Sequence, residues 1–405
     1  MKLGLENIRT LLVELGKPAI NILKIQVAGT NGKGSVCAFL DSICRSAGIR
    51  TGLYTSPHLI SITERIKING IAINEGEFAR IAGFVRETSE LLVKKRRLDS
   101  VPTFFEQVTA IALVAFASHD VDLIILETGL GGRLDATTAA NAEIAAITRI
   151  DLDHQEYLGE TIEEIAAEKA AIIHEGSEVV VAEQNAKAAR VIIERCRAFG
   201  ITPILADRVR TTCGSGWLTF DTDKTAYELD KVGLAGRHQI ENARVAILLA
   251  ETLQVHFPIT TENITGGLRN ARHPGRIESQ GRFLFDGAHN PSGAVALRAY
   301  LDEFVDRPVT LVFGAMLGKD IAPIADALFA RADVLILTQP ANSRAMTASE
   351  IAEHVSGDTF SGDLILTENV AEALRSAERV APDGGITLVT GSLYLVGEAK
   401  SIIGK

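Results

Sequence analysis

The chain has 405 residues, 46% of them apolar, and a formal net charge of −10 at pH 7. This length exceeds what one hydrophobic core usually organises, so we expect two domains, and the acidic balance argues against nucleic acid and anionic membranes as partners. The four cysteines lack the spacing of a zinc site, and neither a signal peptide nor a membrane span is recognisable, so a soluble, reduced, cytoplasmic protein is expected. We also expect a monomer.

Short apolar runs alternate with amphipathic segments along most of the chain, which is typical of a parallel sheet covered by helices. The first strands are expected at 24–28, 51–55, 122–127, 145–150 and 178–182. Residues 205–232 are rich in Thr, Gly and aromatic side chains and predict a small antiparallel insert. The cationic run Lys94–Arg97 is expected to be a solvated face.

The helical pattern breaks at 275–281, which predicts an interdomain linker. Further strands are then expected at 283–285, 309–313, 333–337, 364–367 and 386–390. The predicted fold class is therefore α/β. A P-loop NTPase-like, mostly parallel sheet flanked by helices is expected at 1–276, and a smaller, Rossmann-like domain at 277–405.

The stretch VAGTNGKGS, residues 27–35, lies between a predicted strand and a predicted helix. Backbone N–H groups and a helix N-terminus converge on an anion at such a junction, and glycine lets a phosphate approach the main chain closely. Lys33 can reach the β- and γ-phosphates of a nucleotide, and the Ser35 hydroxyl can touch Mg²⁺. The spacing departs from the usual G-x-x-x-x-G-K-[ST] loop. The expected nucleotide-binding residues here are Gly29, Thr30, Asn31, Gly32, Lys33, Gly34 and Ser35.

Two further polar residues follow predicted strands. Glu127 ends the apolar run VDLIILE, at the carboxyl edge of the sheet where ligands bind in such folds. The alternative is a helix cap or a surface acid. His154 follows the Asp151-Leu152-Asp153 segment, and a lone histidine there is more often structural than a ligand.

Lys169 lies in the helical pattern TIEEIAAEKAAII. The ordinary interpretation is a surface lysine near the end of a helix. No acidic residue stands three or four positions away, so helical spacing provides no ion-pair partner. A lysine on this apolar stripe needs some other partner.

These motifs occur together, in a characteristic order. They include GTNGKGS at 29–35, TSPHL at 55–59, ETGLGGRLDAT at 127–137, EKA at 168–170, GRH at 236–238, HPGR at 273–276 and DGAHNP at 286–291. In these motifs the chain resembles the folate branch of the Mur ligase superfamily, the folylpolyglutamate synthases that often also act as dihydrofolate synthases. Only 28 residues precede Gly29, which favours this branch over the cell-wall ligases, whose loop follows a whole nucleotide-sugar domain.

The resemblance implies a ligase reaction. ATP phosphorylates a substrate carboxylate, and the amine of L-glutamate attacks the acyl phosphate, so the site must stabilise the transferring phosphoryl group and exclude water. The implied substrates are ATP, L-glutamate, and a reduced folate or dihydropteroate, with both activities favoured. Two Mg²⁺ ions are implied, with Ser35, Ser56, Glu127 and His154 as ligands, and a monovalent cation stays open.

The resemblance also assigns roles to individual residues. Lys169 is implied to be carbamylated, although Ala171 replaces a glycine common in the family. Asn242 is implied to recognise the adenine edge, and Gln239, which replaces a frequent asparagine, is given no role. The implied catalytic residues are Lys33, Lys169, His154 and Arg276, and Arg276, Asp286 and His289 complete the nucleotide contacts, with Asp286 on the ribose.

Closure of the second domain, with a hinge near 274–281, would then assemble the site. The expected pterin-binding residues are Ser56, Pro57, His58, Thr103, Phe104, Phe105, Glu106, Leu134, Asp135 and Ala136. Phe104 or Phe105 can stack on a flat ring, but burial of both in the core is an equally natural interpretation. A P-loop phosphotransferase or regulatory NTPase that forms no amide is the alternative function.

Overall fold

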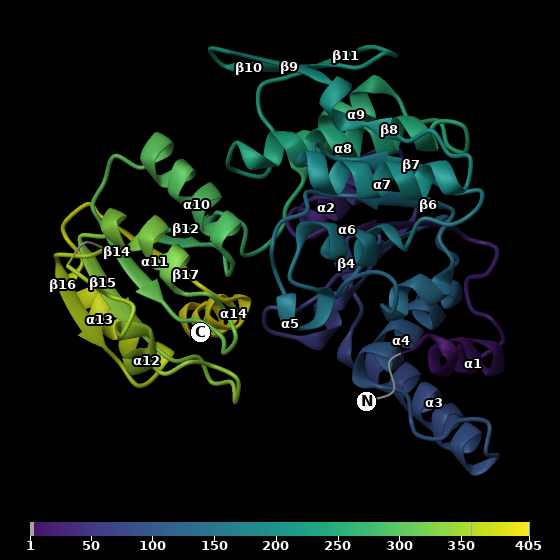
Figure 1. The fold of residues 1–405 in the computed structure, drawn as a ribbon, viewed down its shortest axis with the longest axis horizontal. Coiled ribbons are helices and arrows are strands. Elements are labelled where there is room, and N and C mark those ends of the chain that lie inside the picture. Colours follow the sequence, from purple (N-terminus) through teal and green to yellow (C-terminus); the bar gives the residue numbers. More distant parts are fainter. Residues whose placement is uncertain (1–3, 358, 405) are drawn as a thin grey trace. The chain divides into compact units, whose positions relative to one another are not determined.

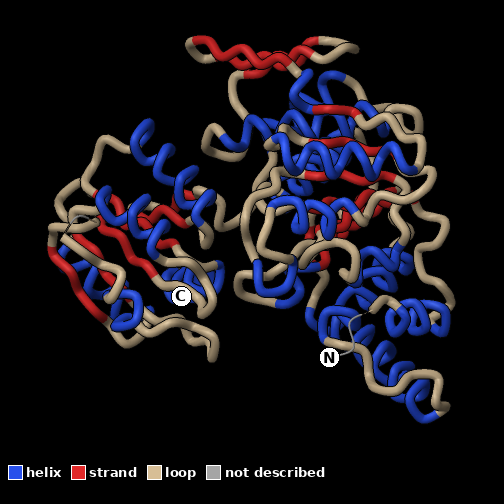
Figure 2. The backbone as a smooth tube through the Cα atoms, in the orientation of Figure 1, coloured by secondary structure: helices blue, strands red, loops and turns tan. Residues whose placement is uncertain are grey.

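The computed structural model describes residues 4–357 and 359–404 (Figure 1). The chain forms two compact units. The first contains the described residues up to Pro57, together with Ile62–Gly233 and Gln239–Arg272. The second contains His273 onward and two short segments from earlier in the chain, His58–Ser61 and Leu234–His238. Both units combine helices and strands (Figure 2).

The first unit is built on an eight-stranded sheet in the order β4-β3-β2-β5-β1-β6-β7-β8. It is parallel except where β3 pairs with β2 and β4. Apolar runs with little polar interruption form its central strands, as expected for a sheet covered on both faces. The strands are β1 (Leu23–Ala28), β2 (Thr51–Tyr54), β3 (Ile66–Ile68), β4 (Ile71–Ala72), β5 (Leu123–Glu127), β6 (Ile144–Ile147), β7 (Glu178–Val181) and β8 (Ile204–Leu205).

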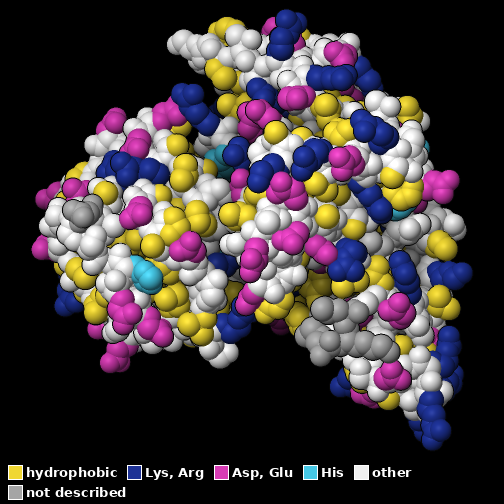
Figure 3. Space-filling view, in the orientation of Figure 1, with side chains coloured by type: hydrophobic (Ala, Val, Ile, Leu, Met, Phe, Trp, Pro, Cys, Tyr) yellow, Lys and Arg dark blue, Asp and Glu magenta, His cyan; other side chains and the backbone are white. Residues whose placement is uncertain are grey.

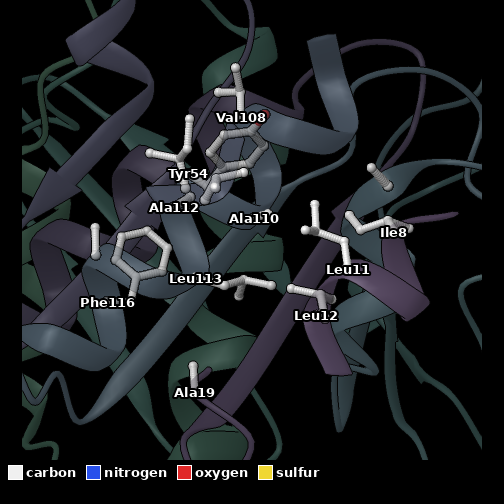
Figure 4. Close-up of a cluster of buried hydrophobic side chains, with 14 of the residues drawn as sticks. Ile8, Leu11, Leu12, Ala19, Tyr54, Val108, Ala110, Ala112, Leu113 and Phe116 are labelled. Carbon is white, nitrogen blue, oxygen red and sulfur yellow. The ribbon is translucent and has the colours of Figure 1, made fainter. Parts of the chain in front are cut away.

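Helices cover this sheet and enclose separate apolar clusters. The helices are α1 (Glu6–Glu14), α2 (Lys33–Ser46), α3 (Glu75–Lys94), α4 (Phe104–Ser118), α5 (Gln155–Leu158), α6 (Ile162–Ala170), α7 (Ala186–Ala198), α8 (His238–Leu253) and α9 (Thr261–Asn270). Figure 4 shows one cluster, to which Leu11 of α1, Phe116 of α4 and Tyr54 at the end of β2 belong. On the same sheet face, α6 and α7 pack over β6 and β7. Helix α2 packs against α9 and against β1, β2 and β5.

The predicted antiparallel insert is present as a three-stranded sheet. Its strands are β9 (Arg210–Gly214), β10 (Trp217–Asp221) and β11 (Ala226–Leu229), and β10 lies between the other two. Short 3-10 turns complete the first unit at η1 (Ile62–Arg65), η2 (Ala136–Ala140) and η3 (Ala206–Arg208).

The second unit contains a six-stranded sheet in the order β12-β13-β17-β14-β15-β16, parallel except for β12. Its strands are β12 (Glu278–Gln280), β13 (Phe283–Phe285), β14 (Val309–Phe313), β15 (Val334–Leu337), β16 (Asp363–Leu366) and β17 (Ile386–Thr390). Helices α10 (Pro291–Phe304), α11 (Ala322–Leu328) and α12 (Ala348–Ala352) enclose one apolar cluster, and η4 (Phe329–Arg331) follows α11. Helices α13 (Val370–Val380) and α14 (Leu393–Ile403) enclose a second cluster.

Two details of the predicted elements are wrong. The segment 275–281 is not only a linker, because Glu278–Gln280 forms β12 and pairs antiparallel with β13. The strand predicted at 145–150 ends at Ile147. The residues after it leave the sheet because Arg149 O accepts hydrogen bonds from the glycine loop and Ile150 N donates to Gln184.

Acidic and basic side chains are interspersed over the face shown in Figure 3. The basic run at Lys94–Arg97, at the end of α3, is exposed as predicted. Among the described residues, none of the helices is both long and apolar enough to span a membrane.

Candidate active site

The glycine loop connects β1 to α2 and is held in place by the segment after β6. The backbone N–H groups of Thr30 and Asn31 both donate to Arg149 O, at 2.9 and 3.2 Å. The Thr30 hydroxyl donates to Asp151 O at 2.9 Å and accepts from Asp151 N at 3.1 Å. The N-cap of α2 is Gly32, which provides no capping side chain. The first turn of α2 therefore presents backbone N–H groups and the positive end of the helix dipole, both of which favour an anion.

Two glycines of this loop have no room for a side chain. Gly32 has a φ of 90°, and a Cβ there would lie 2.2 Å from Asn242 Oδ1. At Gly29, whose φ is 155°, a Cβ would lie 1.9 Å from Thr148 Oγ1. The fold therefore brings Asn242, on α8, against the loop.

Two lysine amines meet at the Gly29 carbonyl. Lys33 Nζ donates to Gly29 O at 2.9 Å and to Thr30 O at 3.0 Å. Lys169 Nζ, from the last turn of α6, donates to the same Gly29 O at 2.8 Å. Lys169 is buried, so the interpretation as an ordinary surface lysine is wrong. Its missing partner is the backbone of the glycine loop.

The pKa of Lys169 reflects this position. Burial, and then the neighbouring charge of Lys33, lower the pKa of Lys169 to about 7, and the carboxylates of Asp153, Asp135 and Glu168 oppose the shift only partly. Desolvation disfavours the ammonium form, and a second cation disfavours it further. A substantial fraction of this amine is therefore neutral at neutral pH.

Glu127 lies at the carboxyl end of β5, beside the loop. It is buried, so it is not a surface acid, and its Oε2 accepts a hydrogen bond from Ser56 N at 2.9 Å. Burial raises the pKa of the Cys37 thiol in α2, and the charge of Glu127 raises it further, whereas the charge of Lys33 lowers it. Ser35 is also buried in the first turn of α2. The structure thus joins two of the predicted metal ligands, Glu127 and Ser56.

His154 is the N-cap residue of α5 and has a φ of 53°, in the left-handed region. Its N–H donates to Asp153 Oδ1 at 2.9 Å, and its imidazole is 3.9 Å from the same carboxylate and 41% exposed. Within 4–357 and 359–404, no three His, Cys, Asp or Glu side chains gather as a metal site. The predicted ligands would supply two serine hydroxyls, one carboxylate and one imidazole, and the imidazole is an unusual ligand for Mg²⁺, which prefers oxygen.

The predicted pterin-binding residues divide into structural and accessible side chains. Thr103 and Glu106 form a capping box at the start of α4, so their polar groups bond to each other's backbone. Phe104 is 57% exposed, with the Arg65 guanidinium 5.6 Å from its ring centroid, so burial of both phenylalanines in the core is wrong. Phe105 is half-buried against Tyr54.

Asp135 organises the loop that follows β5. Its carboxylate is buried and accepts hydrogen bonds from the N–H groups of Gly129, Leu130 and Thr137, at 2.9 to 3.0 Å. Burial raises its pKa, and these hydrogen bonds oppose the shift. Asp135 thus has a structural role, holding this loop, that its sequence motif did not predict. Beside it, Leu134 is half-buried and Ala136 is buried.

The second unit holds the remaining predicted residues. Asp286 is buried, and its two oxygens accept from Ile277 N and Ala288 N, both at 2.9 Å. Burial raises the pKa of Asp286, opposed by Arg276 and His238. His289 Nδ1 contacts Gly287 O at 2.8 Å. His58 also belongs to this unit, whereas the preceding Ser56 and Pro57 belong to the first.

Asp286 therefore holds the turn that carries Arg276. Ile277, next to Arg276, has a φ of 47°. A β-branched residue rarely adopts this conformation, and the hydrogen bond to Asp286 helps to maintain it.

Two buried amides were missed by the sequence interpretation. Gln239 accepts a hydrogen bond from Asn242 Nδ2 at 2.9 Å. Gln26 Nε2, inside β1, lies 2.8 to 3.1 Å from the hydroxyls of Thr128, Thr137 and Thr138. A glutamine inside an apolar strand was the available signal for Gln26.

Comparison with known proteins places this geometry in a family. The Mur ligase middle domain matches residues 27–250, and the Mur ligase glutamate ligase domain matches residues 275–393. A probable bifunctional folylpolyglutamate synthase/dihydropteroate synthase of Haloferax volcanii is 37% identical over 99% of this chain. That alignment covers 48% of the relative, so the chain spans about half of its length.

Solved structures extend the similarity over the whole fold. Folylpolyglutamate synthase of Mycobacterium tuberculosis, complexed with ADP and AMPPCP, has a TM-score of 0.92 and 30% identity, covering 100% of this chain and 96% of the other. A bifunctional folylpolyglutamate synthase/dihydrofolate synthase with Mn, AMPPNP and L-glutamate bound has a TM-score of 0.87 and 30% identity, covering 100% and 95%. The chain belongs to the Mur ligase family.

Proposed function

We propose that this chain is an ATP-dependent ligase that joins L-glutamate to reduced folates and also to dihydropteroate, through an acyl-phosphate intermediate. The observation that carries the proposal is the convergence of the Lys33 and Lys169 amines on the Gly29 carbonyl, within a Mur ligase middle domain. The full-length similarity to a structure with Mn, AMPPNP and L-glutamate bound supports ATP, a divalent metal and glutamate as ligands.

The loop residues have direct roles in this proposal. The N–H groups at the start of α2 bind phosphate oxygens, and Lys33 leaves the Gly29 and Thr30 carbonyls to contact the β- and γ-phosphates. Arg276 neutralises the charge that develops on the transferring phosphoryl group. Asn242 contacts the adenine, with Asp286 and His289 on the ribose side.

Ser35, Ser56, Glu127 and His154 are the residues that would hold divalent metal. Such an ion supplies charge neutralisation to the phosphate oxygens. The buried carboxylate of Glu127, which accepts a hydrogen bond from Ser56 N, fits this role because carboxylate oxygens are preferred ligands of Mg²⁺.

Lys169 is proposed to carry a carbamate. With a pKa of about 7, its neutral amine nitrogen attacks CO₂, an N–C bond forms, and one proton is released, which leaves an anion. Protein equilibrated with ¹³C-labelled bicarbonate should show a carbamate resonance by NMR that Lys169→Arg lacks. Unmodified lysine at high bicarbonate would contradict this assignment.

Phe104 is proposed to stack on the pterin ring, since its side chain is exposed in the segment after Pro102. We also propose that the enzyme is monomeric and cytoplasmic. Size-exclusion chromatography with light scattering tests the oligomeric state, and cell fractionation tests the location.

An ADP-release assay tests the proposal as a whole. Dihydropteroate and tetrahydrofolate are supplied separately, each with and without L-glutamate. ADP release that requires both acid and glutamate supports the ligase, whereas release that ignores both supports a phosphotransferase or regulatory NTPase. Lys33→Ala should abolish turnover while circular dichroism shows an intact fold.

A further inference from the structure

Arg133, in the loop after β5, contacts the last turn of α6 in two ways. Its backbone N–H donates to Glu168 O at 2.9 Å, and its Nε donates to Glu168 Oε1 at 2.8 Å. The last four carbonyls of a helix have no partner within the helix, so the Arg133 N–H satisfies one of them from outside. The residue after Glu168 is Lys169, whose amine donates to Gly29 O.

The backbone just before Arg133 packs directly on the same turn of α6. A Cβ on Gly132 would lie 2.8 Å from Glu168 O and 2.9 Å from Lys169 O. These are main-chain atoms, which cannot move aside as the end of a flexible side chain can. The loop lies this close to the end of α6 because residue 132 has no side chain. Gly132 O in turn accepts from Thr138 Oγ1 at 2.7 Å, which ties the loop to η2.

The position of the Lys169 amine depends on how the end of α6 is held. Burial of an ammonium group is unfavourable and the lysine stem is flexible, so the amine would turn toward water if this turn could shift. The contacts at Glu168 act one residue from the Lys169 backbone. The Arg133 and Glu168 side chains are 58% and 23% exposed, so their ion pair gives direction to the contact and adds little stability.

We propose that Arg133 is a positioning residue, which holds the last turn of α6 so that the Lys169 amine stays on the glycine loop. The chain continues from Arg133 into Leu134, Asp135 and Ala136, the expected pterin-binding residues. The acid substrate and Lys169 therefore share one support, and loss of Arg133 should slow turnover more than it weakens ATP binding. This inference rests on the proposed function, because it takes Lys169 as a catalytic residue.

ADP release with tetrahydrofolate and L-glutamate gives kcat and the KM for ATP. Arg133→Met should lower kcat about fivefold, equivalent to about 1 kcal/mol, the upper end for an exposed ion pair, and leave the KM for ATP within about twofold. Gly132→Ala displaces main-chain atoms and should lower kcat by more than about tenfold. Arg133→Lys keeps a cation that can reach Glu168 and should recover most of the lost kcat.

A second measurement follows Lys169 without any substrate. Its pKa is lowered from 10.5 to about 7 in the folded protein, so it makes stability rise with pH between these values. The charged groups around the amine are Lys33, Asp153, Asp135 and Glu168. If the amine turns toward water, this rise is lost. Urea unfolding in CO₂-free buffer should show the loss in Gly132→Ala, which changes no charge, and a smaller rise in Arg133→Met. Each variant is compared with its own Lys169→Met double variant.

Arg269→Met is the matched control. Arg269 Nε donates to Asp230 Oδ1 at 2.6 Å in the same unit, and this pair is also exposed, at 44% and 55%. The variant should leave kcat and the pH dependence of stability unchanged. Thermal unfolding reports the folded state of every variant. A general loss of stability would lower the unfolding free energy equally at each pH and leave the Lys169 slope in place.

Several outcomes overturn the inference. One is a folded Arg133→Met with the wild-type kcat and the wild-type pH dependence. Another is an Arg269→Met as slow as Arg133→Met, and a third is a Gly132→Ala that keeps the full rise of stability with pH. Wild-type protein that releases no ADP with either acid substrate contradicts the proposed function instead, and the pH measurement then still decides whether the loop holds Lys169.

Discussion

At the residue scale, the carbonyl of Gly29 is the centre of the candidate site. Two amines from different helices donate to this one oxygen, at 2.9 and 2.8 Å. Burial, and then the charge of Lys33, disfavour protonation of Lys169. The chemical state of Lys169 therefore depends on packing that brings α2 and α6 to the same loop.

The stability of the protein should show this effect between about pH 7 and 10.5. In that window the unfolded state binds a proton on Lys169 that the folded state does not, because the folded pKa is lowered from 10.5 to about 7. This residue therefore makes stability rise with pH, by up to about 1.4 kcal/mol per pH unit. Urea unfolding in CO₂-free buffer should show this slope relative to Lys169→Met, and parallel curves for the two proteins would contradict it.

Glycine should be required at position 32 because a side chain would clash with Asn242, as well as because the backbone there has a positive φ. Gly32→Ala places a Cβ 2.2 Å from Asn242 Oδ1, so ATP affinity should fall by more than about tenfold as Asn242 is displaced. Gly48→Ala is a matched control, because Gly48 has a φ of 76° but nothing within 4 Å of the added atom. It should cost about 1 kcal/mol of stability without weakening ATP binding. Equal losses of affinity would show that backbone strain alone is responsible.

At the scale of elements, β1 contributes to the site in two places. Its end leads into the glycine loop, and Gln26 in its middle contacts the loop after β5. Gln26 points toward the segment 128–138 and approaches three threonine hydroxyls, while its neighbours in the strand are apolar. The same segment contains Asp135, which holds the turn at Gly129 and Leu130. The loop after β5 is therefore anchored from inside the sheet.

Gln26→Leu should destabilise the protein by about 2 to 3 kcal/mol, because it leaves buried hydroxyls without their amide partner. Thr252→Val removes a single buried hydroxyl whose hydrogen bond lies within one helix, and it should cost about 1 kcal/mol or less. Chemical denaturation of both variants gives the comparison. An equal effect would mean that the Gln26 network adds nothing beyond one ordinary hydrogen bond.

At the scale of the whole molecule, the two units do not follow a single cut in the chain. His58–Ser61 and Leu234–His238 belong to the second unit although they precede parts of the first. Leu59 belongs to the second unit because its backbone packs against α14, at the position of Gly397, which has no side chain. The second unit therefore includes short segments that lie, in the chain, between segments of the first unit.

Gly397→Ala should destabilise the second unit, since its Cβ would lie 2.0 Å from Leu59 O. Gly83→Ala, in α3, adds the same atom with nothing within 4 Å and should stabilise its helix by about 0.5 to 1 kcal/mol. Thermal unfolding should therefore shift in opposite directions for the two variants. Hydrogen exchange should quicken at 58–61 in Gly397→Ala only, and unchanged exchange there would refute the proposed packing.

The periodicity of the chain was enough to predict the α/β class, most strands to within a residue or two, and the glycine loop between β1 and α2. These features are local, because apolar alternation and glycine chemistry act over a few neighbouring residues. The end of β6 was not predicted because Arg149 O accepts hydrogen bonds from Thr30 N and Asn31 N and not from a neighbouring strand. These donors are more than a hundred residues away in the sequence. The local sequence pattern does not predict such a long-range contact.

The sequence by itself determined which residue types are available for chemistry: the loop lysine, the carboxylate that ends β5 and the histidine after β6. Only the tertiary structure decided that Lys169 is buried on Gly29 O, that Asp135 supports a turn, and that Gln239 accepts a hydrogen bond from Asn242. The physical reason is that burial and hydrogen-bond partners set the charge and orientation of a side chain, and both depend on residues brought together by folding.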